Sequence, residues 1–535
     1  MNLTELIIAE SRERGLQHFF GIPGGGSPLD VMDAGRRYGV DFISVAHESS
    51  AAIMAAYYGA MKGTAGLALA VKGVGAGNLV GGVTNAYFER LPLLCICESP
   101  STDAVNIELV QHCDHQKLFG AVIKHYDTLG ENDQITTIKQ AVSLAVEGRP
   151  GPVLLDLPSD LGQMDCGESI YLQNSAITSS SVHFDIRTAK DMIATAKRPV
   201  ILAGADVIRE NATNHLKTLV ENIQAAVLVT MDARGVFSED QDRWAGVFKG
   251  TFGPNIIETE ILKEADLVLL IGVDAMMSHL PWKINVPTVE FVARSEYSTL
   301  SKPNVRVNGN LKSVIESANG HTTNGFSVKK IQEIRQKISH NFKRPTQTRF
   351  AIQDIIETTR EILPIDGALI SETGAFIAAL EHFWRVKEPQ TYCGTSGGRS
   401  MGLTIPATLG AKLAKPDLPI IGLGGDGSLL MRLGELEVFA RTGIAVPLVI
   451  VNDQSLGTMK WRQKNRDMTD YGLDFYPVDL AMLAKSCGLN GVTVNTPEEF
   501  RRELRLAMNS DKSTLIDARV DPVEYQKGFG KASGV

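Results

Sequence analysis

Apolar runs that stop at glycine or at polar residues recur along the chain, and segments with helical spacing separate them. In the last third, residues 418–423 form an apolar run that stops at glycines, and residues 447–451 form one that stops at polar side chains. A helical pattern over residues 430–442 joins the two runs. We therefore predict two parallel strands whose ends bring Asp426 and Asp453 to the carboxyl edge of a sheet, where open α/β sheets bind their ligands.

The same alternation fills the rest of the chain and predicts an α/β protein with three doubly wound parallel-sheet domains. A serine-rich stretch at 174–181 is typical of a linker, and a polar loop at 343–346 leads into the last domain. We place the domains at residues 1–172, 183–325 and 348–535. The expected strands are 18–20, 41–45, 67–70, 91–97 and 152–155 in the first domain, 199–203, 226–229, 265–271 and 289–292 in the second, and 368–371, 418–422, 446–451 and 514–518 in the third.

Length and composition narrow the class of protein. A chain of 535 residues is too long for one hydrophobic core. The net charge of −8, without any basic run interleaved with aromatic residues, argues against nucleic acid or an anionic membrane as a partner. The start of the chain has no cationic and apolar leader, and the apolar runs are too short or too interrupted to cross a membrane. Six cysteines, of which only Cys95 and Cys97 are close in sequence, do not suggest a disulfide or metal framework, so we expect a cytoplasmic protein.

The two predicted strand ends carry residues of related chemistry. The segment Gly425-Asp426-Gly427-Ser428, taken alone, is more often a plain turn than a ligand site. Asp453 at the neighbouring strand end changes that balance, because two carboxylates at one sheet edge suit a hard cation such as Mg²⁺. The glycines would let the backbone close on a diphosphate.

These motifs resemble the diphosphate-binding domain of thiamine-diphosphate enzymes, in the acetohydroxyacid synthase, benzaldehyde lyase and pyruvate decarboxylase group. The family signature is Gly-Asp-Gly, followed after a helix and a strand by Asn-Asn. The resemblance implies thiamine diphosphate and Mg²⁺ as cofactors, with the metal held by Asp426, Asp453 and the carbonyl oxygen of Ser455. It also implies a first domain that binds the pyrimidine ring and a third that binds the diphosphate. The further cofactor contacts that it implies are Gly25, Asn78, Ser400, Gly425, Gly427, Ser428, Leu456, Gly457, Thr458 and Met459.

Asp453 is a departure from the family pattern, which has asparagine there. Aspartate still offers an oxygen ligand to a cation, but its charge also faces the diphosphate. Asn452 could take over the metal only with a shift of one residue, which turns a strand side chain to the opposite face. We therefore keep Asp453 as the expected ligand.

Two further residues match the family by position. Glu48 follows a predicted strand at the start of a small-residue helix, where a carboxylate commonly stabilises the helix dipole. By resemblance it is instead the acid that hydrogen-bonds the aminopyrimidine of the cofactor and assists its proton transfer. Met401 follows a glycine-rich loop and would ordinarily fill a core. By resemblance it supports the cofactor in its bent conformation.

The segment from Gln111 onwards resembles the family loop that faces the substrate with a glutamine or a pair of histidines. We select His115 as the expected proton relay, with Gln111 and Gln116 as competitors, and a solvent-facing role is about as common for any one of them. Simple pyruvate decarboxylases place a glutamate near position 459, whereas this chain has Met459. Without that acid the resemblance favours joining to a second carbonyl over release of an aldehyde.

The second domain offers little sign of a bound nucleotide. Residues 203–206 lack the glycine triplet of the FAD-binding relatives, and residues 292–296 lack their acidic strand end, so we do not expect FAD.

The sequence thus predicts an acetolactate-synthase-like carboligase that decarboxylates a 2-oxo acid such as pyruvate and passes the acyl unit to an acceptor carbonyl. A decarboxylase or C–C lyase that does not ligate is the alternative within the class. A non-catalytic, cofactor-binding regulatory subunit is the alternative from another class. Family members place each active site between two chains, so we expect a homodimer or homotetramer.

Overall fold

The structure, a computed structural model, describes residues 1–104, 107, 109–130, 133–166, 186–253, 255–320, 325–340 and 349–522. The predicted linker at 174–181 and the predicted loop at 343–346 lie outside these residues, as do four of the predicted domain limits, at 172, 183, 348 and 535.

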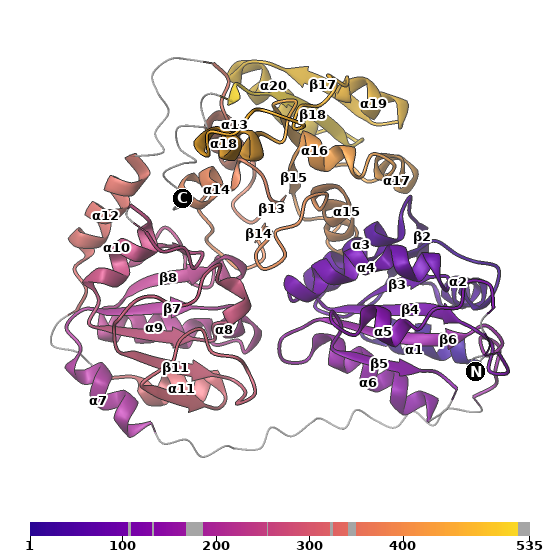
Figure 1. The fold of residues 1–535 in the computed structure, drawn as a ribbon, viewed down its shortest axis with the longest axis horizontal. Helices are drawn as coiled ribbons and strands as arrows, with labels where there is room; N and C mark the ends of the chain where they lie inside the picture. Colours follow the sequence, from indigo (N-terminus) through magenta and orange to yellow (C-terminus); the bar gives the residue numbers. More distant parts are fainter. Residues whose placement is uncertain are drawn as a thin grey trace.

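Three six-stranded sheets, all with parallel pairing between neighbouring strands, form the framework of the molecule. Figure 1 shows them as three lobes, with the first in indigo, the second in magenta and the third in orange to yellow across the top of the view. Each sheet has helices on both faces, which is the arrangement that nearly continuous apolar strands require. The predicted fold class is confirmed.

The first sheet has the strand order β2-β1-β3-β4-β6-β5. The inner strands β1, β3, β4 and β6 are buried along most of their length, whereas the edge strands β2 and β5 are partly exposed. The elements are α1 (Leu3–Glu13), β1 (His18–Gly21), α2 (Ser27–Tyr38), β2 (Asp41–Ser44), α3 (Glu48–Lys62), β3 (Gly66–Ala70), α4 (Val74–Phe88), β4 (Leu93–Ser99), α5 (His115–Phe119), β5 (His125–Thr128), α6 (Gln134–Val146) and β6 (Pro152–Pro158).

The second sheet has the order β12-β11-β10-β7-β8-β9, with β9 at one edge. In this sheet the sequence pattern did not reveal the two edge strands β9 and β12, each of which follows a polar segment. The elements are α7 (Arg187–Thr195), β7 (Pro199–Ala203), α8 (Asp206–Arg209), α9 (Thr213–Ile223), β8 (Ala226–Thr230), β9 (Trp244–Phe248), α10 (Ile257–Glu264), β10 (Leu267–Ile271), β11 (Thr288–Val292), β12 (Val305–Asn308), α11 (Leu311–Ala318) and α12 (Val328–His340).

The third sheet has the order β14-β13-β15-β16-β18-β17. The chain runs from β13 outward to β14 and then returns to β15 on the other side of β13, so the strand order reverses between β13 and β15. The elements are α13 (Ile352–Ile362), β13 (Ala368–Ser371), α14 (Ile377–Phe383), β14 (Tyr392–Cys393), α15 (Thr404–Ala414), β15 (Ile420–Gly425), α16 (Asp426–Leu430), α17 (Glu435–Thr442), β16 (Pro447–Asn452), α18 (Gly457–Asn465), α19 (Leu480–Ser486), β17 (Asn490–Val494), α20 (Pro497–Met508) and β18 (Thr514–Arg519).

The helical pattern at 430–442 does not form one helix, and that prediction is wrong. The chain forms α16, turns, and restarts as α17 after Gly434. A Cβ atom at Gly434 would lie 2.7 Å from the Cβ of Ala46, so the turn allows the first domain to approach closely.

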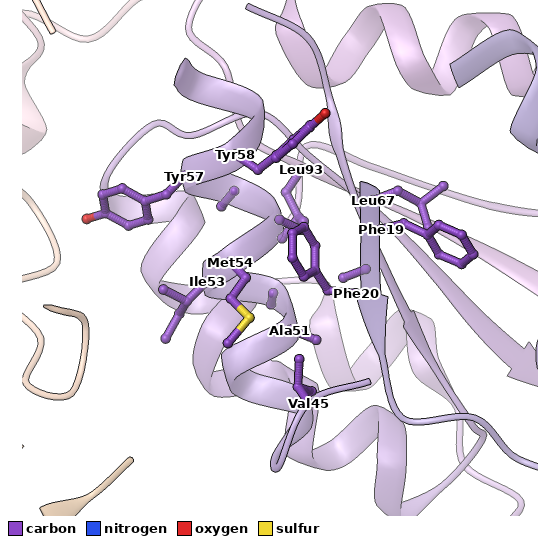
Figure 2. Packing of buried hydrophobic residues seen from close by; sticks show 14 of the residues in the cluster. Phe19, Phe20, Val45, Ala51, Ile53, Met54, Tyr57, Tyr58, Leu67 and Leu93 are labelled. Atoms are coloured by element: carbon purple, nitrogen blue, oxygen red, sulfur yellow. The ribbon is translucent and has the colours of Figure 1, made fainter. Parts of the chain in front are cut away.

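Helix α3 is buried on all sides and joins the first domain to the third. Figure 2 shows Phe20 between α3 and the sheet, while Ile53 and Tyr57 point away from the sheet. Helix α15 of the third domain packs against α3 so tightly that a Cβ at Gly410 would lie 2.2 Å from the carbonyl oxygen of Met54. One hydrophobic cluster therefore runs through both domains and fixes their relative position.

Among the described residues, we find no helix that combines the length and the apolar character needed to cross a bilayer.

Candidate cofactor and active site

Asp426 and Asp453 meet at the carboxyl edge of the third sheet. Asp426 is the first residue of α16, and Asp453 directly follows β16. Gln454, in the left-handed conformation with φ of 58°, turns the backbone so that its N–H donates to the Oδ2 atom of Asp426 at 2.8 Å. The N–H of Gly427 donates to Oδ1 of Asp426 at 2.7 Å. The turn after β16 thus holds Asp426 beside Asp453.

The side chain of Asn452 is held by partners of its own, one of which it shares with Asp426. Its amide nitrogen donates to the Oδ1 atom of Asp517 at 2.7 Å, and its amide oxygen accepts from the N–H of Gln454 at 3.0 Å. Asp453 instead has its Oδ1 atom 3.1 Å from the N–H and 3.2 Å from the hydroxyl of Ser455. Asp453, and not Asn452, lines the cavity together with Asp426.

A cavity of about 500 Å³ opens on the two carboxylates. It lies where the strand order of the third sheet reverses, which is the usual ligand site of an open α/β sheet. The loops after β13, β15 and β16 form one side, with Met401 and Arg399. The loops after β9 and β10 of the second domain form the other side, with Lys249, Phe252 and His279.

The donor set at the edge suits a divalent cation that arrives with a phosphate group. Burial, and next the charge of Asp453, raise the pKa of Asp426 to about 7, and burial raises the pKa of Asp453 as well. A cation between the two carboxylates would offset both effects. Among the described residues, no cluster of three or more His, Cys, Asp or Glu side chains could hold a metal. Mg²⁺ typically binds one or two carboxylates and completes its shell with phosphate and water oxygens, so the pair fits a metal diphosphate.

The raised pKa of Asp426 makes stability depend on pH. Between its ordinary value of 3.8 and about 7, the folded protein retains a proton that the unfolded chain has released. We therefore expect the Tm of the cation-free protein to fall as pH rises through this range, and Asp426→Asn to remove much of that slope. Calorimetric unfolding of both proteins across the range measures the difference, and identical slopes would contradict the assignment.

The first domain presents the second predicted half of the site. Glu48 is the first residue of α3, where His47 caps the helix by accepting from the N–H of Ser49 at 3.1 Å. The carboxylate of Glu48 is buried, and its Oε2 atom accepts from the side-chain amide of Asn78 at 3.0 Å. The structure thus brings together Glu48 and Asn78, two of the residues predicted from sequence.

The glycine-rich loop before α15 connects the two halves. Ser400 accepts a hydrogen bond from the amide of Asn85 at 3.3 Å. Met401 lines the 500 Å³ cavity and also a shallower one that Asn78 and Ser400 share. Arg399 has a φ of 45°, a left-handed conformation that is uncommon for residues other than glycine. Such backbone conformations are concentrated at functional sites, which agrees with a functional role for this loop.

The predicted substrate-loop residues differ in their positions. Gln111 is exposed and has a φ of 62°. It lies so close to Gly73 that a Cβ atom added to Gly73 would be 2.6 Å from the carbonyl oxygen of Gln111. Gln111 therefore lies beside the start of α4, the helix that carries Asn78. His115 is buried, with its Nδ1 atom 2.8 Å from Asp156, and lines neither cavity.

Of the remaining predicted cofactor contacts, most line the main cavity and Gly25 does not. Gly425, Gly427, Ser428 and residues 455–459 line the main cavity. Gly25 is exposed in the loop after β1, and a Cβ there would meet no atom within 4 Å.

Models of thiamine pyrophosphate enzyme domains match the chain in three places. Residues 1–118 match the N-terminal TPP binding domain, residues 186–317 the central domain, and residues 372–518 the C-terminal TPP binding domain. The chain belongs to the thiamine pyrophosphate enzyme family. The three matches follow the three sheets in order, and they indicate thiamine diphosphate as the cofactor of this family member.

Relatives of this thiamine pyrophosphate enzyme include acetolactate synthase large subunits. The protein of that name from Buchnera aphidicola subsp. Acyrthosiphon pisum is 27% identical over 98% of this chain and 95% of its own length. A probable acetolactate synthase large subunit from Methanocaldococcus jannaschii is also 27% identical, over 98% of this chain and 93% of its own. The acetolactate synthase isozyme 3 large subunit from Escherichia coli is 26% identical over 98% of this chain and 95% of its own length.

Sequence reasoning missed two buried glutamates that hold the site of this family member in shape. Glu372, directly after β13, accepts from the N–H groups of Leu403 and Gly425 at 2.7 and 3.0 Å. Glu89 of the first domain accepts from the N–H groups of Ser396 and Gly398 at 2.7 and 2.9 Å, and so anchors the loop that carries Met401. Only the place of Glu372 at a strand end could have given a signal.

Proposed function

We propose that this chain is a thiamine-diphosphate- and Mg²⁺-dependent carboligase, similar to acetolactate synthase. It would decarboxylate a 2-oxo acid such as pyruvate and pass the acyl unit to an acceptor carbonyl. The observation that carries the proposal is the single cavity that joins the Asp426 and Asp453 carboxylates to a cationic wall. When bound, thiamine diphosphate supplies the carbon nucleophile and the electron sink. The chain's own residues bind the cofactor, orient the 2-oxo acid and transfer protons.

The cationic wall supports an anionic substrate. Arg399 and Arg462 line the cavity, and among the described residues neither guanidinium group has a hydrogen-bond or ion-pair acceptor. Burial, and then the charges of Arg399, Lys249 and Arg462, lower the pKa of His279 to about 4, so this histidine is neutral. A guanidinium group binds a carboxylate with two parallel hydrogen bonds, which suits the carboxylate of a 2-oxo acid.

The rest of the lining supports transfer over release. Among the lining residues, all of which the structure describes, Glu381 is the one acidic residue besides Asp426 and Asp453. Its Oε2 atom lies 2.7 Å from the Nζ atom of Lys249. Met459 also lines the cavity, at a position where a proton donor would favour aldehyde release. This wall leaves the acyl unit to react with a second carbonyl.

A second copy of the chain would complete the site. The lining of the main cavity comes from the second and third domains, and Glu48 is not part of it. Exposed apolar side chains flank both halves: Val74 and Val110 are 69% and 85% exposed on the first domain, and Met431 and Tyr476 are 55% and 85% exposed on the third. Such side chains commonly mark protein interfaces. A homodimer or homotetramer would bury them and bring Glu48 of one chain to the cavity of another.

Product analysis tests the proposed reaction. The protein, loaded with thiamine diphosphate and Mg²⁺ and supplied with pyruvate, is expected to form acetolactate or another ligated product. Free acetaldehyde without any ligated product would favour a decarboxylase and contradict the ligation step. Absence of thiamine diphosphate binding in calorimetry would instead favour a non-catalytic role.

Substitution of Arg399 tests the substrate class. We expect Arg399→Gln to raise the KM for the 2-oxo acid at least about tenfold, because it removes a charge-assisted pair of hydrogen bonds, while kcat changes less. Steady-state kinetics over a range of acid concentrations gives both constants. Arg505→Gln is the control, since Arg505 is exposed on α20 and pairs with Glu361. A KM for Arg399→Gln equal to that of the control would contradict this role.

A further inference from the structure

A second cavity, of about 430 Å³, lies between the edge strand β9, helix α12 and helix α14. It belongs to the boundary between the second and third domains. Lys249 and Glu381 line it and also line the main cavity, so the two spaces share one wall. Nothing in the proposed reaction uses this second cavity. Its polar lining residues include Asn255, Gln332, Gln336 and Ser339.

Two arginines of this cavity stack on one tryptophan. The guanidinium carbon of Arg335 lies 4.6 Å from the centre of the Trp244 ring, and that of Arg385 lies 4.5 Å from it. Stacking on an aromatic ring holds a guanidinium group in place without neutralising its charge. Two like charges are therefore held close together by the same side chain.

The hydrogen-bonding capacity of the two arginines is largely unused. Within the described part of the chain, Arg335 makes one long hydrogen bond, 3.4 Å from its Nη1 atom to the carbonyl oxygen of Trp244. The Nη1 atom of Arg385 is buried without an acceptor among the described residues, and so is the indole N–H of Trp244. Buried donors without acceptors are uncommon in folded proteins and call for an explanation.

The carboxylates around the cavity have partners of their own, and the Oε2 atom of Glu258 and the Oε1 atom of Glu381 are in addition buried without a hydrogen-bond donor among the described residues. Glu381 pairs with Lys249, with 2.7 Å between Oε2 and Nζ. Glu258 accepts from the N–H and the hydroxyl of Thr251 at 3.2 and 3.0 Å. Just outside the cavity, both oxygens of Glu239 accept from Arg234 at 2.8 Å, Asp240 pairs with Lys387, and Asp242 accepts from Gln332. Burial, and then the charge of Arg335, lower the pKa of Arg385 to about 10, and the charges of Glu239 and Asp240 offset this effect in part.

We propose that this cavity binds a small polar anion that carries a phosphate or carboxylate group, with Arg335 and Arg385 as its charged ligands. The guanidinium fork matches the oxygens of both groups. The amide and hydroxyl side chains of the lining would bind further polar atoms of such a metabolite. The volume lies within the range of small-molecule sites, about 300–1,000 Å³. The site is distinct from that of the cofactor and does not depend on the proposed reaction.

Thermal unfolding of the full-length protein tests the proposal. The probes are inorganic phosphate and succinate, each titrated without Mg²⁺ at an ionic strength held constant with sodium chloride. The cationic wall of the main cavity is a second place where an anion can bind, so the titration is repeated with Arg399→Gln, in which that wall is altered and the 430 Å³ cavity is not. We expect a saturable rise in Tm, because a ligand that binds only the folded state stabilises it in proportion to its occupancy. Saturation with phosphate alone assigns a phosphate ester, and saturation with succinate alone assigns a carboxylate.

Matched variants locate the site. Arg385→Gln and Arg335→Gln are each expected to weaken binding at least about tenfold, the effect of losing a charged hydrogen-bond donor. Arg360→Gln is the control, because Arg360 stacks on Trp384 at 4.5 Å and does not line the cavity. A wild-type Tm that does not saturate with either anion would overturn the proposal. So would a titration that is unchanged in both cavity variants, and if one variant does not fold, the other decides.

Discussion

Replacing Glu48 with glutamine is expected to lower kcat by about 100-fold or more, the usual contribution of a positioned acid or base. Glu48 is buried at the first position of α3, and its carboxylate accepts from the amide of Asn78 at 3.0 Å. Glutamine has nearly the same shape and can accept the same hydrogen bond through its amide oxygen. It cannot share a proton with a ring nitrogen of the bound cofactor. The substitution therefore removes proton transfer and keeps the packing.

Three measurements separate this role from a structural one. Turnover is measured with saturating thiamine diphosphate and Mg²⁺, the affinity for thiamine diphosphate by calorimetry, and Tm by thermal unfolding. We expect Tm and the affinity for thiamine diphosphate to change little while kcat falls strongly. Glu10→Gln is the control, since Glu10 is another buried carboxylate of the first domain and pairs with Arg14 at 2.9 Å. Turnover in Glu48→Gln close to that of Glu10→Gln would remove the catalytic assignment.

The convergence of Asp426 and Asp453 could be predicted because it depends on local pattern and on a general rule. Apolar runs mark buried parallel strands, and parallel strands in one sheet end at a common edge. The same reasoning fixed the side of Asn452, because successive residues of a strand alternate between faces. These features need no knowledge of which distant segments meet.

The features that the sequence did not predict depend on contacts between distant segments. Glu89 holds the loop at Ser396 through hydrogen bonds that span more than half the chain, and no local pattern marks such a pair. The turn at Gly434 interrupts a good helical pattern because the first domain approaches there. The cationic wall of the main cavity combines Lys249 of the second domain with Arg399 of the third. Tertiary contact determined each of these details.

This chain has Asp453 where the family pattern has asparagine, so substitutions of Asp426 and of Asp453 are expected to affect cofactor binding differently. Asp426→Asn is expected to weaken Mg²⁺-dependent binding of thiamine diphosphate by about 100-fold or more, since even indirect partners of a metal contribute 10–100-fold. Asp453→Asn is expected to keep that binding. An amide oxygen can still accept from the N–H of Ser455 and face a cation, and the loss of one negative charge favours the incoming diphosphate.

The pH dependence of cofactor binding separates this account from a simple loss of ligands. In the wild type, burial and the charge of Asp453 raise the pKa of Asp426 to about 7, so a proton competes with Mg²⁺ below that pH. Asp453→Asn removes the neighbouring charge and lowers this pKa. We therefore expect its binding of thiamine diphosphate and Mg²⁺ to persist to lower pH than in the wild type, as measured by calorimetry across the range. An unchanged pH profile would show that the two carboxylates do not act on one cation, and a loss of binding as large as in Asp426→Asn would make Asp453 an indispensable ligand in its charged form.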